Sequence, residues 1–362
     1  MFNLASALVQ RGVAATVVSL AQSESDTVEG NIRVIRIRGR LSVGSVLSFP
    51  PLGTASRIVR LLGDGDVSAV STHTRFFPMS SVGVHVAKSL NVPLIHTEHG
   101  ADFVRGQSPF VSLAARLVDY SLGRRVLKKS TAVLAVSEAV QRFVKRLAGV
   151  DAQLFYSAVN ADEWRPTAFD DLPQQGHVVF VGRIVPGKGW ERFLDVAASV
   201  LSQLGENAPH FDAFGEGPQL NDLRSEIQSR GLSAIVTAHG QASPCVLKGV
   251  LQGGVLVNPS TLAEGFQLTL VEAAAAGARI VSYPVPGLQA LIASGVAVTT
   301  VDVDNPTALA SAVLESLRQP ARTMNDDTAR EWSWAKRAET YSGVMDGLAG
   351  RVFAQRAEAG RS

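Results

Sequence analysis

Two cationic side chains near the middle of the sequence could bind a phosphate-bearing ligand. Arg183 and Lys188 lie in VGRIVPGKGWERF, residues 181–193, where a β-branched run ends in Gly182 and a glycine-bearing turn leads into a helical pattern. Open α/β sheets bind phosphate where a strand's carboxyl end meets such a turn and a helix. Two converging cations could neutralise a diphosphate without a metal ion; the alternative is a solvated turn with ordinary surface charges.

Two glutamates eight positions apart follow in NPSTLAEGFQLTLVEAAAAGA, residues 258–278. Glu264 precedes a predicted helix, and Glu272 lies inside it. Helical side chains tilt toward the N-terminus, so both carboxylates could contact one ligand above the loop, where free backbone N–H groups favour an anion. One of them is expected to accept hydrogen bonds from ribose hydroxyls. The alternative for Glu272 is a glutamate on the helix surface.

Two further segments carry weaker signals. FGEGP, residues 214–218, places Gly215 and Gly217 in a turn between a strand and a helix, where ligand contact and close packing are both open.

The second weaker segment is IHTEHGADF, residues 95–103, which places His96, Glu98 and His99 at the end of a strand. Strand alternation would put His96 and Glu98 on one side. A metal triad is disfavoured because no further ligand of matching spacing is visible. His99 is therefore interpreted as a polar group in a cleft between domains, with a satisfied core histidine as the alternative.

Short β-branched runs alternate with longer amphipathic segments along the chain, which predicts the α/β fold class with parallel sheets. The expected strands are residues 13–20, 31–38, 67–72, 92–97, 131–136 and 152–157, then, after a turn-rich linker at 164–176, residues 177–182, 210–214, 234–239, 254–259 and 278–283. We expect two Rossmann-like doubly wound domains, residues 1–165 and 166–327. One long helical pattern begins at Thr328 and forms, with the tail, a segment 328–362 that crosses back toward the first domain.

The predicted first domain opens on a helix rather than a strand. Leu4, Ala7 and Leu8 share one helical face, and no strand precedes them. A doubly wound half normally opens with a central strand, so the first sheet is expected to lack its middle. Each unpaired backbone group at such a gap would cost ~1–3 kcal/mol. We therefore expect the natural reading frame to begin upstream, with a strand and a glycine-rich turn; the alternative is another pairing that closes the sheet.

Composition and charge exclude several classes of protein. The 362 residues are 46% hydrophobic and 18% charged, which excludes long disorder, and the single Cys245 excludes an intrachain disulfide and indicates a reducing compartment. No apolar run reaches bilayer length and no signal sequence is visible, so a cytoplasmic location is expected. Residues 1–165 carry 19 basic and 12 acidic side chains, a net +7, whereas residues 166–362 carry 15 and 20, a net −5.

This asymmetry favours an anionic membrane surface or an acidic acceptor over nucleic acid, because no recognition signature accompanies the basic residues. Between residues 116 and 146 the cations alternate with apolar side chains, a pattern typical of peripheral surface helices. An ordinary solvated face is the alternative. The cations are Arg116, Arg124, Arg125, Lys128, Lys129, Arg142, Lys145 and Arg146.

Together these motifs resemble the retaining glycosyltransferases of group 1, or family four, which include bacterial lipid and polysaccharide hexosyltransferases and have the GT-B fold. The resemblance rests on VGRIVPGKG, FGEGP, VTAHG and PSTLAEGFQLTLVEAAAAGARIV, with looser support from AVSEAVQRFV, SAVNADEWRP and the Trp-bearing terminal helix.

The resemblance implies that Arg183 and Lys188 hold the donor diphosphate and stabilise it as it leaves. Glu272 would bind the ribose, Glu264 would lie beside the transferred sugar, and His99 would face that sugar. The loop would contact sugar and phosphate through the backbone of Gly265, Phe266, Gln267 and Leu268, while Gly215 and Gly217 would also lie at the donor.

Two departures from the family pattern stand out. Gln267 replaces a frequent glycine and is expected to narrow the donor-sugar pocket, and the N-terminal strand and glycine-rich loop that approach the acceptor are absent.

The expected function is transfer of a hexose from a UDP- or GDP-sugar to a lipid or saccharide acceptor, with retention of configuration and without metal or cofactor. The expected location is the cytoplasm or the inner face of the membrane. An epimerase would need other carboxylates and histidines, and a dinucleotide oxidoreductase would need a G-x-G-x-x-G turn after a strand. The remaining alternative is a truncated, non-catalytic nucleotide-binding or scaffold protein of the same fold.

Overall fold

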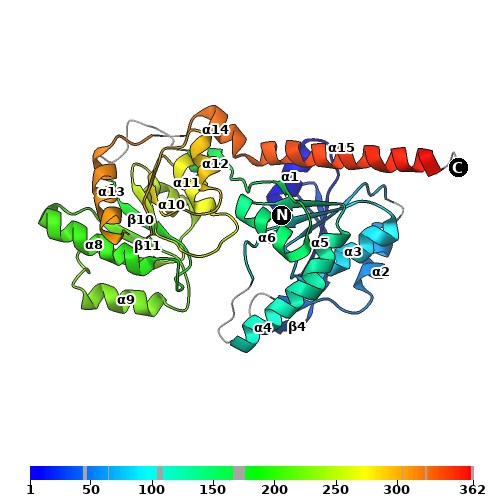
Figure 1. Cartoon of the computed structure of the whole chain (residues 1–362), viewed down its shortest axis with the longest axis horizontal. Coiled ribbons are helices and arrows are strands. Elements are labelled where there is room, and N and C mark those ends of the chain that lie inside the picture. Colours follow the sequence, from blue (N-terminus) through cyan, green and yellow to red (C-terminus); the bar gives the residue numbers. More distant parts are fainter. Residues whose placement is uncertain are drawn as a thin grey trace. The chain divides into compact units, whose positions relative to one another are not determined.

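The computed structural model describes residues 1–43, 47–63, 65–103, 109–165, 176–303, 305–322 and 324–359, and it has the predicted α/β architecture (Figure 1). Two compact units divide the chain. Unit 1 comprises Met1–Ser157 and Trp334–Ser362, and unit 2 comprises Ala158–Ser333. The domain limits expected at residues 165 and 327 stay predictions, and most of the expected linker lies outside the described residues.

Unit 1 contains two separate main sheets. The first has the order β1-β3-β2, with β1 parallel and β2 antiparallel to β3, and the second is the parallel sheet β6-β7-β8-β9. A short antiparallel ribbon pairs β4 with β5. The strands are β1 (Thr16–Ala21), β2 (Ser25–Glu29), β3 (Ile32–Arg38), β4 (Arg40–Val43), β5 (Leu47–Phe49), β6 (Val70–His73), β7 (Leu94–Glu98), β8 (Ala132–Ala135) and β9 (Gln153–Leu154).

The helices of unit 1 cover these sheets. They are α1 (Phe2–Gln10), α2 (Thr54–Leu62), α3 (Pro78–Leu90), α4 (Pro109–Val118), the π-helical segment η1 (Asp119–Gly123), α5 (Arg124–Lys129), α6 (Glu138–Ala148) and α15 (Trp334–Ala359). The predicted apolar face of α1 is confirmed, because Leu4, Ala7 and Leu8 are buried in one cluster with Ala338 and Tyr341 of α15. Among the helices described, none has both the length and the apolarity needed to cross a bilayer.

In the described part of the chain, no strand pairs with both main sheets of unit 1. β1 pairs only with β3, and β6 pairs only with β7, so each has one edge without a hydrogen-bonded neighbour there. This is the split expected for a sheet that lacks its central strand. The expectation about an upstream segment stays a prediction.

Unit 2 is built on one parallel sheet of order β12-β11-β10-β13-β14-β15. Its strands are β10 (Val178–Val181), β11 (Phe211–Phe214), β12 (Val236–Gly240), β13 (Val255–Asn258), β14 (Arg279–Ser282) and β15 (Val298–Thr300). Counted within the unit this is the order 3-2-1-4-5-6 of a doubly wound sheet, whose topological switch point lies between β10 and β13. Ligands bind at the carboxyl ends of strands at such a point.

Helices connect the strands of this sheet and bury its two faces. They are α7 (Ala161–Trp164), α8 (Trp190–Leu204), the 3₁₀ turn η2 (Gly205–Asn207), α9 (Leu220–Ser229), α10 (Pro244–Leu251), α11 (Leu268–Ala275), α12 (Leu288–Ala293), α13 (Pro306–Arg318) and α14 (Asp326–Glu331). The long helix expected from Thr328 is interrupted between α14 and α15. The Val159 N–H donates to the Trp332 carbonyl at 3.0 Å, and the Trp332 indole donates to Ser294 at 2.8 Å, so this residue is fixed to unit 2 before the chain enters α15.

Candidate donor site

The candidate site lies at the switch point of unit 2, where the loops after β10 and β13 pack against each other. The Thr261 N–H donates to the Gly187 carbonyl at 2.8 Å. A Cβ at Gly189 would lie 2.2 Å from the Pro259 carbonyl oxygen, so only glycine permits this approach. The two segments in which sequence patterns placed Arg183, Lys188 and Glu264 are therefore brought together.

Lys188 and Glu264 form an ion pair across these two loops. The Lys188 ammonium donates to the Glu264 carboxylate at 2.8 Å, and Lys188 is 8% exposed. Arg183 is exposed, and its guanidinium has no hydrogen bond or ion pair with any residue that the structure describes. Lys188 thus has a carboxylate partner, whereas the guanidinium of Arg183 stays available to an anion, and the convergence of the two cations on one ligand stays a prediction.

Glu272 lies in the second turn of α11 and is half-buried. Burial raises the pKa of its carboxyl from 4.5 to about 7, because little water remains to solvate the charged form. Its carboxyl group has no hydrogen-bond partner in the described ranges. These properties differ from those of an ordinary solvated glutamate on a helix surface.

The side chain of Gln267 is an unusual feature of the loop before α11. Gln267 is the N-cap residue of this helix but makes no side-chain cap, and it is 4% exposed. Both its amide oxygen and its amide nitrogen are buried without a hydrogen-bond partner among the described residues. A buried amide without hydrogen-bond partners lowers the stability of the fold by about 1–3 kcal/mol. A ligand that supplies these partners would remove this cost.

The neighbours of Gln267 show how the rest of the loop is held. The Phe266 ring stacks on Trp332 with 5.5 Å between centroids, and a Cβ at Gly287 would lie 2.4 Å from that ring. Gly265 is buried, and Leu268 is 37% exposed. Since the Phe266 side chain packs within unit 2, this residue would reach a ligand through its backbone, as the family resemblance implies.

Gly215 and Gly217 have a packing role in the same region. A Cβ at Gly215 would lie 1.8 Å from the Gly182 carbonyl oxygen, and a Cβ at Gly217 would lie 2.2 Å from that of Ile184. The Gly182 N–H donates to Phe214, which joins the loops after β10 and β11. Close backbone packing thus explains both glycines, and their contact with a ligand stays a prediction.

His99 belongs to unit 1, at the end of β7, and lies beside a buried ionic network. The Glu98 carboxylate accepts from the backbone N–H groups of His99 at 3.0 Å and Gly100 at 2.8 Å, and from the Arg75 guanidinium at 3.0 Å. Arg75 also donates twice to Asp119 at 2.9 Å. The network therefore fixes the turn that carries His99.

The protonation of this network favours an ionised glutamate and a neutral histidine. Burial alone would raise the pKa of Glu98, but the hydrogen bond with His96, at 3.3 Å, and the charge of Arg75 outweigh it and hold the pKa at about 2. Desolvation by the surrounding residues lowers the pKa of His99 to about 4, although the residue is exposed at the surface. The His99 ring stacks on His73, and their nitrogens lie 3.2 Å apart. A neutral His99 can exchange hydrogen bonds with uncharged hydroxyl groups.

Sequence patterns did not identify Arg75, Asp119 or the unpaired amide of Gln267. Arg75 and Asp119 are 44 positions apart, and no local periodicity links them. His96 and Glu98, which strand alternation would put on one side, lie within hydrogen-bond distance of each other at 3.3 Å. In the described part of the chain, no group of three or more His, Cys, Asp or Glu side chains is arranged to hold a metal ion.

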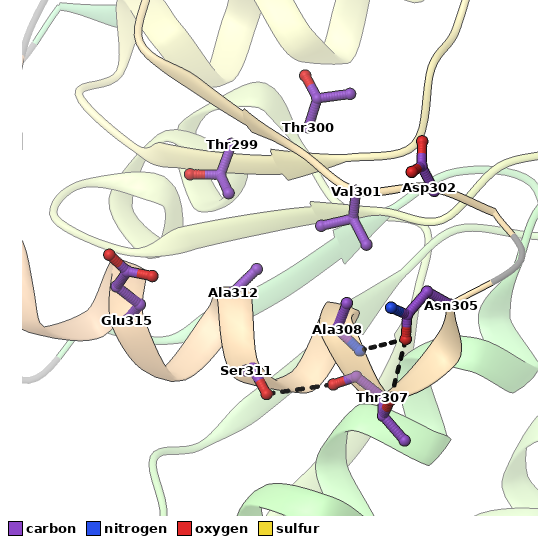
Figure 2. Close-up of a pocket in the computed structure, with 10 residues that line it drawn as sticks. All are labelled: Thr299, Thr300, Val301, Asp302, Asn305, Thr307, Ala308, Ser311, Ala312 and Glu315. Atoms are coloured by element: carbon purple, nitrogen blue, oxygen red, sulfur yellow. Dashed lines mark hydrogen bonds between the residues drawn. The ribbon is translucent and has the colours of Figure 1, made fainter.

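A separate pocket lies at the edge of the unit 2 sheet, between β15 and α13 (Figure 2). None of its lining residues belongs to the predicted site, and its polar side chains include Thr299, Asp302, Asn305 and Glu315. Asn305 caps α13 by accepting from the Ala308 N–H at 3.2 Å, so this polar group already has a structural role. The switch point therefore remains the better candidate for chemistry.

Comparison with known proteins identifies the family. Residues 175–319 match the family described as glycosyl transferases group 1, and residues 1–163 match glycosyltransferase family 4. The chain belongs to the group 1 glycosyltransferases. This glycosyltransferase is 27% identical over 323 residues to phosphatidyl-myo-inositol mannosyltransferase of Mycobacterium tuberculosis, covering 85% of this chain and 81% of the relative. It is 26% identical to D-inositol 3-phosphate glycosyltransferase 1 of Catenulispora acidiphila, covering 73% and 67%.

Solved structures support the same fold. Sucrose-phosphate synthase from Thermosynechococcus elongatus superposes with a TM-score of 0.68 at 20% identity, covering 97% of this chain and 92% of that one. Anabaena HepE, in complex with UDP and glucose, superposes with a TM-score of 0.63 at 18% identity, covering 99% and 94%. These likenesses confirm the predicted GT-B fold of two Rossmann-like domains.

Proposed function

We propose that this glycosyltransferase moves a hexose from a UDP- or GDP-sugar to a saccharide or lipid acceptor, with retention of anomeric configuration and without a catalytic metal. The observation that carries the proposal is the set of groups at the switch point of unit 2. Lys188, paired with Glu264 at 2.8 Å, offers positive charge there, as does the Arg183 guanidinium, which has no partner in the described part of the chain. The half-buried Glu272 offers an acceptor for hydroxyl groups.

The chemistry follows from the charges that develop during transfer. The bond between the anomeric carbon and the β-phosphate oxygen breaks, so negative charge grows on the phosphate and positive charge on the sugar ring. Lys188 and Arg183 would stabilise the phosphate. A bond then forms between the anomeric carbon and the acceptor oxygen on the same face, and the acceptor's hydroxyl proton passes to the leaving phosphate.

The two carboxylates would have different tasks. Glu264 lies beside Lys188, so a bound diphosphate would share this ammonium while Glu264 accepts hydrogen bonds from the donor sugar. Glu272 would accept from the ribose hydroxyls, which favours its charged form. Gln267, whose buried amide has no partner among the described residues, would donate to or accept from the donor sugar or its phosphate.

The names of similar proteins suggest which substrates to test first. HepE was crystallised with UDP and glucose, which supports a uridine nucleotide as the first donor. The phosphatidyl-myo-inositol mannosyltransferase and the D-inositol 3-phosphate glycosyltransferase support inositol-bearing acceptors, with and without a lipid.

The test starts with a thermal-shift screen of UDP- and GDP-sugars, followed by NMR of products formed with inositol and phosphatidylinositol acceptors. An unchanged anomeric configuration and a rate indifferent to a chelator are expected. Lys188→Ala should lower the rate by orders of magnitude, whereas Arg224→Ala, which removes an exposed cation on α9, should not. Inversion of configuration, or loss of activity with chelator, would overturn the corresponding part of the proposal.

The alternative of a nucleotide-binding protein without turnover draws on one observation, the split between β1 and β6 in unit 1. The same screen separates the two functions. A scaffold would bind the nucleotide through unit 2 but would neither hydrolyse nor transfer the sugar.

A further inference from the structure

The continuous helical run from α4 through η1 to α5 exposes large apolar side chains. Phe110 is 83% exposed, Leu113 is 58% exposed and Leu117 is 63% exposed, and Tyr120 and Leu122 of η1 are exposed as well. A surface helix normally turns its apolar side chains toward the core, and the exposed apolar side chains of α4 and η1 depart from that arrangement. A contiguous exposed apolar patch indicates an interaction surface.

The charged side chains of the same run have one sign. Its five exposed charged residues are all cations: Arg116, Arg124, Arg125, Lys128 and Lys129. The acidic residue within it, Asp119, is 1% exposed and is bound by Arg75. From residue 110 to residue 129, the described surface of this run therefore combines apolar groups with uncompensated positive charge.

The run is anchored at its C-terminal end. Arg75 holds Asp119 through two hydrogen bonds of 2.9 Å, and a Cβ at Gly123 would lie 3.3 Å from the Arg75 side chain. Val126 and Leu127 of α5 are buried. Figure 1 shows α4 extending from this anchored part as one continuous rod. The apolar side chains are thus presented by a helix whose base is fixed.

We propose that α4 and η1 insert their apolar side chains into the interface of an anionic lipid bilayer, while the cations of α5 contact the lipid phosphates. Interfacial helices bind through this combination of buried apolar area and attraction to anionic headgroups. Charge favours a bilayer over a second copy of the chain, since two such surfaces would bring ten like charges together. Membrane binding by this surface is a property separate from the proposed transfer reaction. It can therefore be measured without any donor sugar.

The experiment is co-sedimentation of the full-length chain with phosphatidylcholine vesicles, with and without phosphatidylglycerol. We expect binding only to the anionic vesicles, and weaker binding when salt is added. The double variant Leu113→Ser, Leu117→Ser should reduce the affinity by about tenfold or more, because two exposed leucines no longer enter the interface. The matched control is Val28→Ser, Leu52→Ser, which removes two exposed apolar side chains of unit 1 outside the run and should bind as wild type does.

Charge is tested separately with Arg124→Gln, Arg125→Gln, which should also weaken binding about tenfold or more, whereas Arg60→Gln, Lys88→Gln should not. Circular dichroism checks that each variant is folded. Binding that is equal for both lipid compositions, or unchanged in the leucine variant, would overturn the proposal. Self-association in analytical ultracentrifugation that the leucine variant abolishes, without vesicle binding by wild type, would assign the surface to a second copy instead.

Discussion

Replacing Glu272 with glutamine is expected to stabilise unit 2 and, at the same time, to weaken nucleotide binding. In the folded protein burial raises the pKa of this carboxyl from 4.5 to about 7. The folded state therefore holds a proton that the unfolded chain has already lost between these two pH values. The resulting destabilisation is absent well below pH 4.5, grows as pH rises toward 7 and is complete above it. Glutamine has nearly the same shape and does not titrate.

The size of the effect follows from the two pKa values. A shift from 4.5 to about 7 corresponds to at most about 3 kcal/mol of unfolding free energy above pH 7. At pH 5 the same shift costs less than about 1 kcal/mol, because most of the carboxyl is still protonated when folded. The stabilising effect of Glu272→Gln should therefore increase by about 2 kcal/mol between pH 5 and pH 8.

Urea unfolding at the two pH values measures this difference. Trp164, Trp190 and Trp332 lie in unit 2, so tryptophan fluorescence follows mainly this unit. Glu315→Gln on α13 is the matched control, since it removes an exposed carboxylate and should show no comparable pH dependence. A Glu272→Gln effect that is the same at pH 5 and pH 8 would refute the argument from burial.

Nucleotide binding gives an independent measurement on the same side chain. If ribose hydroxyls bind the charged form, UDP or GDP binding at pH 7 should release about half a proton from Glu272, whose pKa is about 7. Calorimetry in buffers of different ionisation enthalpy detects this release, which Glu272→Gln should abolish. The variant should also weaken binding by ~1–3 kcal/mol. Unchanged affinity and proton release would place Glu272 outside the nucleotide site.

Three further variants test other parts of the structure. Lys188→Ala should depress transfer by orders of magnitude while the chain stays folded, as measured by initial rates and by urea titration. Gly215→Ala should lower the melting temperature strongly, since its Cβ would lie 1.8 Å from a carbonyl oxygen; an unchanged melting curve would contradict this packing. Glu98→Gln should cost ~3–5 kcal/mol at pH 7 by leaving Arg75 partly unpaired. Because the Glu98 pKa is about 2, the stability that its charge provides in wild type should persist above pH 4.5 and disappear as pH falls toward 2.

The sheet of unit 2 was largely predictable because its signals are local. The strands β10 to β14 are short, largely buried runs bounded by turns, and their parallel order places the following loops at one edge. The missed strand is β15, which has only three residues and is partly exposed, so its pattern resembles a loop. The interruption at Trp332 was also missed, because it depends on hydrogen bonds to Val159 and Ser294, which are remote in sequence.

The candidate site was predictable to a smaller extent. The sequence singled out Lys188 and Glu264 in two separate motifs, and the structure brings their side chains within 2.8 Å of each other. Burial of Glu272 and the missing partners of the Gln267 amide depend on tertiary packing, which periodicity does not reveal. The ionic network of Arg75 is still less accessible to sequence patterns, since its partners come from separate elements.

The charges at the switch point explain how unit 2 can hold a binding site for a diphosphate without a large loss of folding stability when no ligand is bound. Lys188 is neutralised by Glu264 at 2.8 Å, and Glu272, with a pKa of about 7, avoids a full buried charge at neutral pH. An incoming diphosphate would share Lys188 and use the exposed Arg183, while ribose hydroxyls would stabilise the Glu272 carboxylate. Donor binding would thus create the charged state of the site, so the arrangement favours a complete nucleotide sugar over a simple anion. Inorganic phosphate lacks a ribose and should not release the Glu272 proton.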